Sequence, residues 1–304
     1  MDGTTPLPEL AHVATDLPEP HPLVPASAHV GAKLRALDEG VREGAQRIIT
    51  GADPEAVHDF RVYLRQLRTL LKLARPLYSR HLADAVRTSF VEIHRATGAL
   101  RDEEALEETF AALTVRHPAF DAWKKRRATR ARGLRRTVIA RVSSKDLAHA
   151  EDMLHALLIL PVHPKRERDL QWFARRKVEV ALTNAERLAR KEKYQPEELH
   201  ALRIACKQLR YTVEFFDEAL PEPLRALRKP AVKLQKVLGD VHDLDVALVV
   251  MQRQHALPAT VRTRILRELS TRRAEKVAAF EALRAPLPPN GAGEPPAPAP
   301  ALAR

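Results

Sequence analysis

The sequence predicts an all-α fold, and three features of the chain lead to that prediction. Between about residues 29 and 284 apolar side chains recur every three or four positions, in stretches rich in Ala, Leu, Arg and Glu. The alternation of apolar and polar residues that marks strands is scarce there. Prolines divide the pattern into segments of helix length. We therefore expect helices near residues 29–50, 54–75, 79–98, 102–114, 118–142, 145–160, 166–192, 196–217, 222–238, 243–255 and 258–284.

Two of these helices, at 54–75 and 196–217, carry the same motif: a histidine followed by cations at offsets of 3, 7 and 10 residues. At about 100° per residue these positions fall within about 80° of one another, so each set forms one basic ridge on its helix. Closely spaced cations of this kind suit the binding of an anion. The motif residues are His58, Arg61, Arg65 and Arg68 in the first helix and His200, Arg203, Lys207 and Arg210 in the second.

An apolar stripe accompanies each basic ridge. Pro54 and Pro196 stand in the first turn of the two helices, where a missing N–H costs nothing. Each helix should therefore pack by its stripe and present its cations along the rim. Cys206, the only cysteine, falls on the second stripe and is expected to be a small core residue. The stripes are Val57, Phe60, Leu64, Leu67 and Leu71, and Leu199, Leu202, Cys206, Leu209 and Val213.

The repeat extends on both sides of the motif helices. Before them, Lys33 matches Arg175 and Arg35 matches Lys177, at the separation of 142 positions that also relates the two motif histidines. After them, residues 95–104 resemble residues 236–245 at a separation of 141. So long a period predicts a duplicated helical bundle rather than a solenoid. We expect a first half at about 29–143 and a second at about 144–284, related by a pseudo-twofold axis, with the two basic ridges facing each other.

The composition limits the choice of partner and location. Thirteen of the 23 prolines lie in residues 1–28 and 285–304, and both segments are expected to be disordered tails. The formal net charge of +12 favours a polyanion such as nucleic acid, an acidic membrane surface or a phosphate chain. The sequence has no apolar run long enough to span a bilayer and no secretory signal, so residence in the cytoplasm is expected.

The motif helices and the segments after them resemble the CHAD (conserved histidine α-helical) domain family over roughly residues 28–284. The first copy reads Val-His-Asp-Phe-Arg from Val57, and the second reads Leu-His-Ala-Leu-Arg from Leu199. The segment from Leu238 to Val246 is similar to the LGxxxDxDV element of the family. The resemblance implies two helical bundles related by pseudo-twofold symmetry around a basic central groove or pore. It also implies binding of inorganic polyphosphate without catalysis, and targeting to polyphosphate granules.

The predicted polyphosphate-binding residues are the eight motif residues together with Lys33, Arg35, Arg175, Lys177, Arg95 and Lys236. Arginines can grip two phosphate oxygens with forked donors, whereas Lys207 acts as a movable point charge. A bound polyanion should favour the protonated form of the motif histidines, so binding should strengthen as the pH falls toward about 6. The pattern indicates no catalytic residue, no metal and no cofactor.

Two alternative functions stay open. The arginine content also fits a nucleic-acid-binding protein, for which the run from Lys124 to Arg136 is the densest basic segment, although aromatics make up only 5% of the chain. The acidic corners at Asp102 and Asp243 invite comparison with metal-dependent phosphohydrolases. At this corner His242 of the second copy stands where the first copy has Arg101, but the sequence does not supply the further ligands such a metal would need. The sequence does not indicate an oligomeric state.

Overall fold

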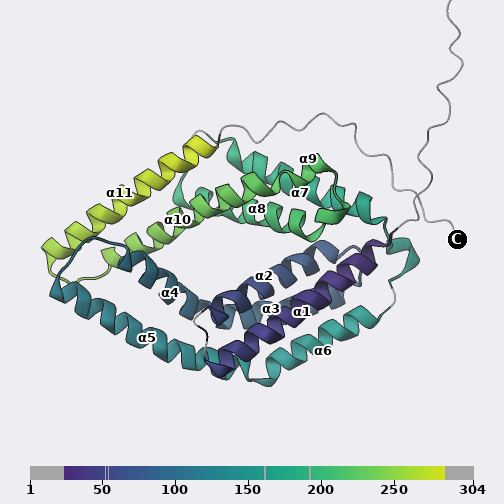
Figure 1. The fold of residues 1–304 in the computed structure, drawn as a ribbon, viewed down its shortest axis with the longest axis horizontal. Coiled ribbons are helices and arrows are strands. Elements are labelled where there is room, and N and C mark those ends of the chain that lie inside the picture. The colour runs from purple at the N-terminus through teal and green to yellow at the C-terminus, as the bar shows by residue number, and fades with distance from the viewer. Residues whose placement is uncertain (1–23, 52, 54, 161, 192, 285–304) are drawn as a thin grey trace, which may run out of the picture.

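The computed structural model describes residues 24–284 apart from 52, 54, 161 and 192, and its regular elements within that range are all helices (Figure 1). The prediction of an all-α fold is therefore confirmed. Of the predicted tails at 1–28 and 285–304, residues 1–23 and 285–304 lie outside the described residues. The first half contains α1 (Ala26–Thr50), α2 (Ala56–Ala74), α3 (Arg80–Ala96), α4 (Gly98–Ala111) and α5 (Pro118–Val142). The next helix, α6 (Lys145–Ile159), which the expected boundary near residues 143–144 assigned to the second half, packs on α3 and α5 and is therefore grouped with the first half. The second half contains η1 (Pro164–Arg166), α7 (Leu170–Ala189), α8 (Pro196–Phe215), η2 (Asp217–Ala219), α9 (Glu222–Arg225), α10 (Arg228–Gln252) and α11 (Ala259–Leu283).

The described residues just before α1, Val24 and Pro25, are part of the fold. α1 begins at Ala26, ahead of the expected start at residue 29, because backbone hydrogen bonds fix the preceding segment. The amide of Ala26 donates to the carbonyl of Arg168 at 2.9 Å, and the amide of Leu170 donates to the carbonyl of Val24 at 2.9 Å. These bonds join the segment before α1 to the segment before α7, so the starts of the two halves lie side by side.

The prediction of two helices at 222–238 and 243–255 is wrong, because it places the break between them inside a helix. The short α9 is followed by α10, which runs without interruption through Leu238 and Gly239. Its buried face continues across this point with Leu234, Leu238 and Val241, so packing favours a continuous helix over a break at the glycine. The first half does break at the equivalent place, where Thr97 separates α3 from α4.

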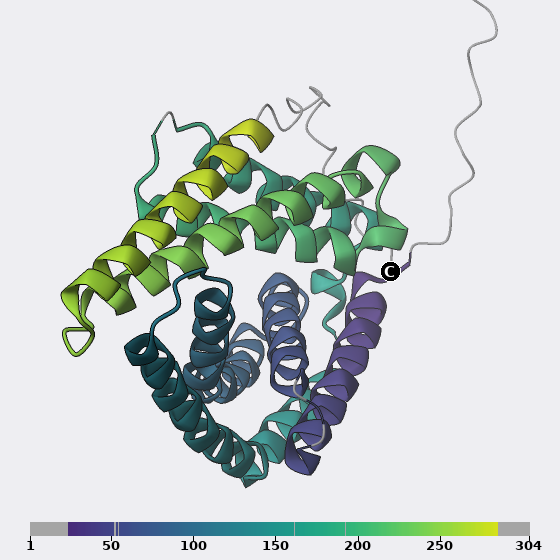
Figure 2. The same cartoon turned by 60° about the vertical axis from the view of Figure 1, so that its left-hand side comes forward.

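The same succession of packed helices occurs in both halves. α1 packs on α2 as α7 packs on α8, α2 on α3 as α8 on α10, and α4 on α5 as α10 on α11. α5 and α11 are both 25 residues long and begin 141 positions apart, at Pro118 and Ala259. This agreement supports the predicted repeat, while the symmetry axis stays a prediction. Figures 1 and 2 show α7, α8, α10 and α11 forming one layer over the first half.

Two apolar cores cross from one half to the other. The larger packs α1, α2, α3 and α6 against α7 and α8, with Phe60 and Phe216 fully buried in it. The second packs the end of α4 and the start of α5 against α10 and α11, where the Phe110 and Trp123 rings meet edge to face at 4.9 Å. The halves are therefore fixed to each other by buried apolar surface at two places. Two further pairs of helices make contact across the halves, α2 with α8 and α4 with α10.

The prediction that Cys206 is a core residue is confirmed. Its side chain is buried in a third apolar core, formed by α8, α10 and α11, that includes Leu202 and Phe280. Burial raises the pKa of the Cys206 thiol to about 12. Among the described helices, none has the length and apolarity that crossing a membrane would require.

Gly44 allows α1 to approach α2 closely, because a Cβ at this position would lie 3.1 Å from the Cα of Phe60. We expect Gly44→Ala to lower the free energy of unfolding by about 1–3 kcal/mol through overpacking. Gly133 in α5 has open space around its Cβ position, so Gly133→Ala is the matched control and should raise the free energy of unfolding by about 0.5–1 kcal/mol. Urea denaturation measures both values. Equal effects of the two substitutions would contradict this packing.

Candidate anion-binding site

Cations from both halves meet where α2 contacts α8. We call this set the cationic cluster, and it consists of Arg61, Arg65 and Arg68 from α2 and Arg203 and Lys207 from α8. The four arginines all act on Lys207, because the positive charge of each lowers the pKa of its ammonium group. Three of the four predicted motif residues on α2 and two of the four on α8 are thus brought together, and the predicted convergence of the two ridges is seen in these five side chains.

Lys207 is at the centre of the cluster electrostatically. Burial, and then the charges of Arg65 and Arg203, lower its pKa to about 7. Arg65 and Lys207 hold the equivalent position in the two copies of the motif, 142 residues apart. Their charges lie close enough to act on each other, and such proximity of equivalent positions is what a twofold relation between the halves would produce. Because one of these two positions carries a lysine instead of a second arginine, the ligand-free site can lose a proton at Lys207, which reduces the repulsion between the cations.

Arg61 is held by the end of α3. Its Nη1 donates to the carbonyl of His94 at 2.7 Å and to the hydroxyl of Thr97 at 2.6 Å. The side chain is buried, and burial, followed by the charge of Arg65, lowers the pKa of Arg61 to about 10, while Asp102 opposes that shift. A charged guanidinium is thus kept inside the protein by hydrogen bonds to backbone and hydroxyl oxygens rather than by a paired carboxylate.

A glycine leaves room for each of the two first arginines of the motif. A Cβ at Gly98 would lie 3.9 Å from Nη1 of Arg61, and a Cβ at Gly239 would lie 3.6 Å from Nε of Arg203. The glycines are 141 positions apart and are equivalent in the repeat. The acidic corners are matched too, since Asp102 acts on Arg61 and Asp243 acts on Arg203.

The cluster has donors that nothing in the described part of the protein satisfies. The buried Nε atoms of Arg61, Arg68 and Arg203 have no hydrogen-bond partner there. No carboxylate among the described residues lies within ion-pair distance of any of the five cations. Buried polar groups are normally hydrogen-bonded, and unused N–H groups on converging cations are suited to the oxygens of an anion.

Three histidines border the cluster and are held neutral. His200 and His242 face each other with their Nδ1 atoms 3.2 Å apart, so that one donates and the other accepts. Burial, with Arg203 next, lowers the pKa of His242 to about 4 and also lowers that of His200. Burial and Arg61 lower the pKa of His94 to about 3. Among the groups of the cluster and its border whose pKa is shifted, Lys207 is therefore the one that titrates near neutral pH, whereas the pKa of the motif histidine His200 is lowered. His58 is exposed at the start of α2.

The structure gives several other predicted residues different contacts. Lys33 pairs with Glu218 at 3.8 Å, Arg175 with Glu179 at 3.0 Å and Arg210 with Glu214 at 2.8 Å. Lys177 lies over the ring of Phe173 at 4.9 Å, and Arg35 lines a cavity with Asp38 between α1 and α6. These five residues are not brought into the cluster, so a role for them in binding stays a prediction. Lys236 is exposed on α10.

The sequence-based prediction missed three residues beside the cluster, namely Arg87, His94 and Thr97. Arg87 and the predicted Arg95 lie close enough to Arg68 for their charges to lower its pKa. Arg87 matches Arg228 at the repeat separation of 141, and this match could have identified it. His94 and Thr97 correspond to Gln235 and Leu238, so the repeat gave no signal for them.

The basic run in α5 is partly paired with the acidic face of α4. Arg127 and Arg130 bind Glu103 at 2.6 and 3.2 Å, and Arg135 binds Glu104 at 2.7 Å. Lys124 pairs with Asp121 at 2.9 Å, and the other cations of the run face solvent, as on a solvated helix flank. The exposed ones are Lys125, Arg126, Arg132 and Arg136.

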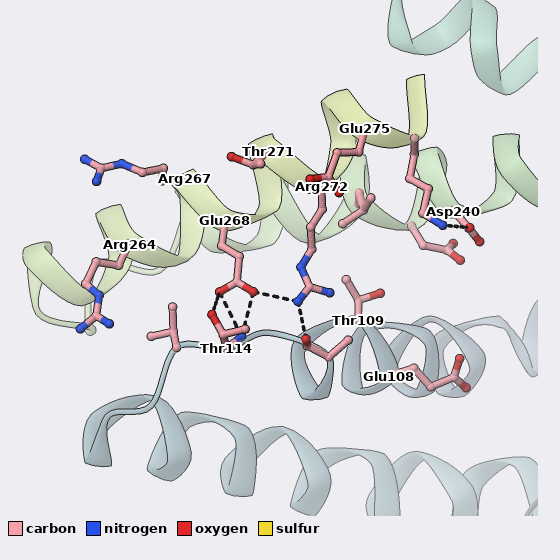
Figure 3. Close-up of a pocket in the computed structure, with 15 residues that line it drawn as sticks. Glu108, Thr109, Thr114, Asp240, Arg264, Arg267, Glu268, Thr271, Arg272 and Glu275 are labelled. Carbon is pink, nitrogen blue, oxygen red and sulfur yellow. Dashed lines mark hydrogen bonds and ion pairs between the residues drawn. The ribbon is translucent and has the colours of Figure 1, made fainter. Parts of the chain in front are cut away.

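A cavity of about 810 Å³ lies beside the cluster, between α4, α10 and α11 (Figure 3). Figure 3 shows Glu268 of α11 turned toward Thr114, whose hydroxyl donates to it at 2.9 Å, and toward Arg272, which pairs with it at 2.8 Å. Asp243 also lines this cavity. Because the wall carries both acidic and basic side chains, with Glu268 paired to Arg272 and Asp240 paired to Lys276, the cavity does not present the one-signed charge of the cationic cluster. The predicted central groove along both ridges stays a prediction.

Family models and solved structures that are similar to this chain identify its fold. A family model described as the CHAD domain matches residues 27–252. The crystal structure of the CHAD domain from the plant Ricinus communis superposes with a TM-score of 0.71 at 23% identity, covering 86% of this chain and 91% of that one. PptA from Streptomyces chartreusis superposes with a TM-score of 0.63 at 16% identity, covering 86% and 97%. No curated protein sequence matches this chain. The two structures show a shared fold, and the match of the family model over most of the chain shows that this protein belongs to the CHAD domain family.

Proposed function

We propose that the protein binds inorganic polyphosphate at the cationic cluster and does not catalyse its conversion. The observation that carries this proposal is the convergence of five cations from two helices with no carboxylate partner in the described residues. A polyphosphate chain presents about one negative charge per phosphate and only oxygen acceptors, so a row of guanidinium and ammonium groups suffices to bind it. Membership of the CHAD domain family supports the same ligand, and the proposed place of binding is polyphosphate granules in the cytoplasm.

The neighbours of the cluster favour a polymer without bases. The side chains around it include further arginines, neutral histidines, Thr97 and the carboxyl groups of Asp102 and Asp243. Tyr211, which lies near Arg203, is buried in the larger apolar core. Single-stranded nucleic acid is usually bound by stacking on aromatic side chains as well as by charge. Duplex DNA remains the alternative that the exposed cations of α5 favour.

The acidic corners have a simpler role than catalysis. Asp102 and Asp243 lie where their charges act on Arg61 and Arg203, and burial raises the pKa of Asp243 despite that neighbour. Within the described residues no group of three or more His, Cys, Asp or Glu side chains is arranged to hold a metal ion. We therefore propose that the two carboxyl groups partly offset the charge of the motif arginines. This leaves the phosphohydrolase alternative without support from a ligand set.

Reversal of one charge in the cluster should weaken binding far more than the same reversal outside it. We expect Arg65→Glu to reduce the affinity for long-chain polyphosphate by about 10- to 100-fold, since a hydrogen bond to a charged group contributes about 1.5–3 kcal/mol. Arg132→Glu on the exposed face of α5 makes the same change in net charge and should have a much smaller effect. Isothermal titration calorimetry at moderate salt measures both. No binding by the unaltered protein, or equal losses in the two variants, would reject the proposed site.

Competition with nucleic acid distinguishes the two polyanions. Because phosphate contacts release counterions, the affinity should fall steeply with added salt for either ligand. At fixed salt, duplex DNA at the same phosphate concentration should displace little labelled polyphosphate, as followed by fluorescence anisotropy. Efficient displacement by DNA would favour the nucleic-acid alternative.

Binding should depend on pH through Lys207. In the free protein its pKa is about 7, and a bound polyanion must raise it. Above about pH 7 the free lysine is neutral and has to take up a proton on binding, so affinity should fall by up to about tenfold per pH unit between pH 7 and 9, and change little from this group below pH 6. In Lys207→Arg the side chain stays charged, and the slope should be lost. Titration calorimetry in buffers of different ionisation enthalpy counts the proton. An unchanged slope in Lys207→Arg would assign it to another group.

A further inference from the structure

The two halves differ at the point where each first arginine of the motif meets the neighbouring helix. In the first half the helix is broken: α3 ends at Ala96, Thr97 intervenes, and α4 begins at Gly98. In the second half the equivalent stretch, 141 positions later, lies inside the continuous helix α10. The same motif arginine therefore faces a helix end in one half and a helix interior in the other.

The break gives Arg61 acceptors. Carbonyls in the last turn of a helix lack their usual i→i+4 partner, and Arg61 uses the carbonyl of His94 for one of its two bonds. The second bond goes to Thr97, whose hydroxyl in turn donates to the same His94 carbonyl at 2.9 Å. Thr97 is fully buried and Arg61 is 8% exposed. Arg61 thus caps the end of α3 and fixes the junction between α3 and α4.

Arg203 has none of these acceptors. The carbonyl equivalent to that of His94 belongs to Gln235 in the interior of α10, where the helix uses it for its own hydrogen bonds. The residue equivalent to Thr97 is Leu238, which has no hydroxyl. The guanidinium lies over Gly239 with its Nε buried and unpartnered, and the side chain is only half-buried.

We propose that the two equivalent arginines have separate roles, with Arg61 a positioning residue that caps α3 and Arg203 the arginine that donates to the oxygens of the bound polyphosphate. The inference rests on the proposed function and adds to it an unequal use of the two halves. The second half then makes the stronger direct contacts with the ligand, through Arg203 and Lys207. The first half contributes the fixed α3–α4 junction and the charges of Arg65 and Arg68.

The test compares Arg61→Gln with Arg203→Gln, which remove the same single charge and so reduce long-range attraction equally. Two quantities are measured for each: the Kd for a polyphosphate of defined length, by titration calorimetry, and the Tm of the ligand-free protein. Arg203→Gln should weaken binding by about tenfold or more and leave the Tm nearly unchanged. Arg61→Gln should lower the Tm by about 2–4 °C and weaken binding less than Arg203→Gln does.

Thr97→Val provides a control that removes no charge. It deletes the hydroxyl acceptor of Arg61 while keeping the shape of the side chain, so it should lower the Tm and leave the affinity for polyphosphate unchanged. Equal losses of affinity in Arg61→Gln and Arg203→Gln would overturn the proposal, as would an unchanged Tm in Thr97→Val. Failure of the unaltered protein to bind polyphosphate would instead reject the proposed function, and the Tm values would still test whether Arg61 caps α3.

Discussion

The mutual repulsion of cations at the meeting of α2 and α8 is the constraint on which the rest of the structure depends. Burial and like charges lower the pKa of Lys207, Arg61 and Arg203 together, which means that the ligand-free protein keeps these charges close at a cost in free energy. Something else must hold the two helices in place. The two apolar cores that cross between the halves do so, at the α1–α7 end and at the α4–α11 end of the molecule.

This arrangement separates the source of stability from the source of function. The cores bury aromatic and aliphatic side chains and contain few charges, so the proposed binding of an anion at the cluster should leave them unchanged. Apart from Arg61, whose hydrogen bonds fix the end of α3, the cationic cluster contributes little to stability by itself, since among the described residues its charges lack carboxylate partners and the Nε groups of Arg68 and Arg203 lack acceptors. An anion that supplies oxygens would relieve both deficits, and ligand binding should therefore stabilise the folded protein as well as occupy the site.

The internal repeat is visible in contacts and not only in sequence. Arg61 with Gly98 corresponds to Arg203 with Gly239, and the two acidic corners act on these same arginines. The copies have nevertheless diverged where the neighbouring helix breaks at Thr97 in one half and continues through Leu238 in the other. A duplicated scaffold can thus keep its packing while its equivalent side chains acquire different partners.

The sequence by itself determined the helical class, the two motif helices and their basic ridges, because these follow from the spacing of residues along a helix. It did not determine the continuity of α10, since a glycine allows a break and only the packing of Leu234, Leu238 and Val241 decides against one. It also could not choose among the cations. Lys33 of α1 pairs with Glu218 of η2 while Arg68 stays with the cluster, and this depends on which carboxylate lies within reach in space. The Arg210–Glu214 pair is different, because its spacing of four residues on one helix is contained in the sequence.

The lowered pKa of Lys207 and the neutrality of the neighbouring histidines likewise belong to the tertiary structure. Both arise from burial and from charges that are contributed by other helices, and no local pattern contains that information. Periodicity records which face of a helix a residue occupies. Only the folded chain decides which residue of another helix meets it there.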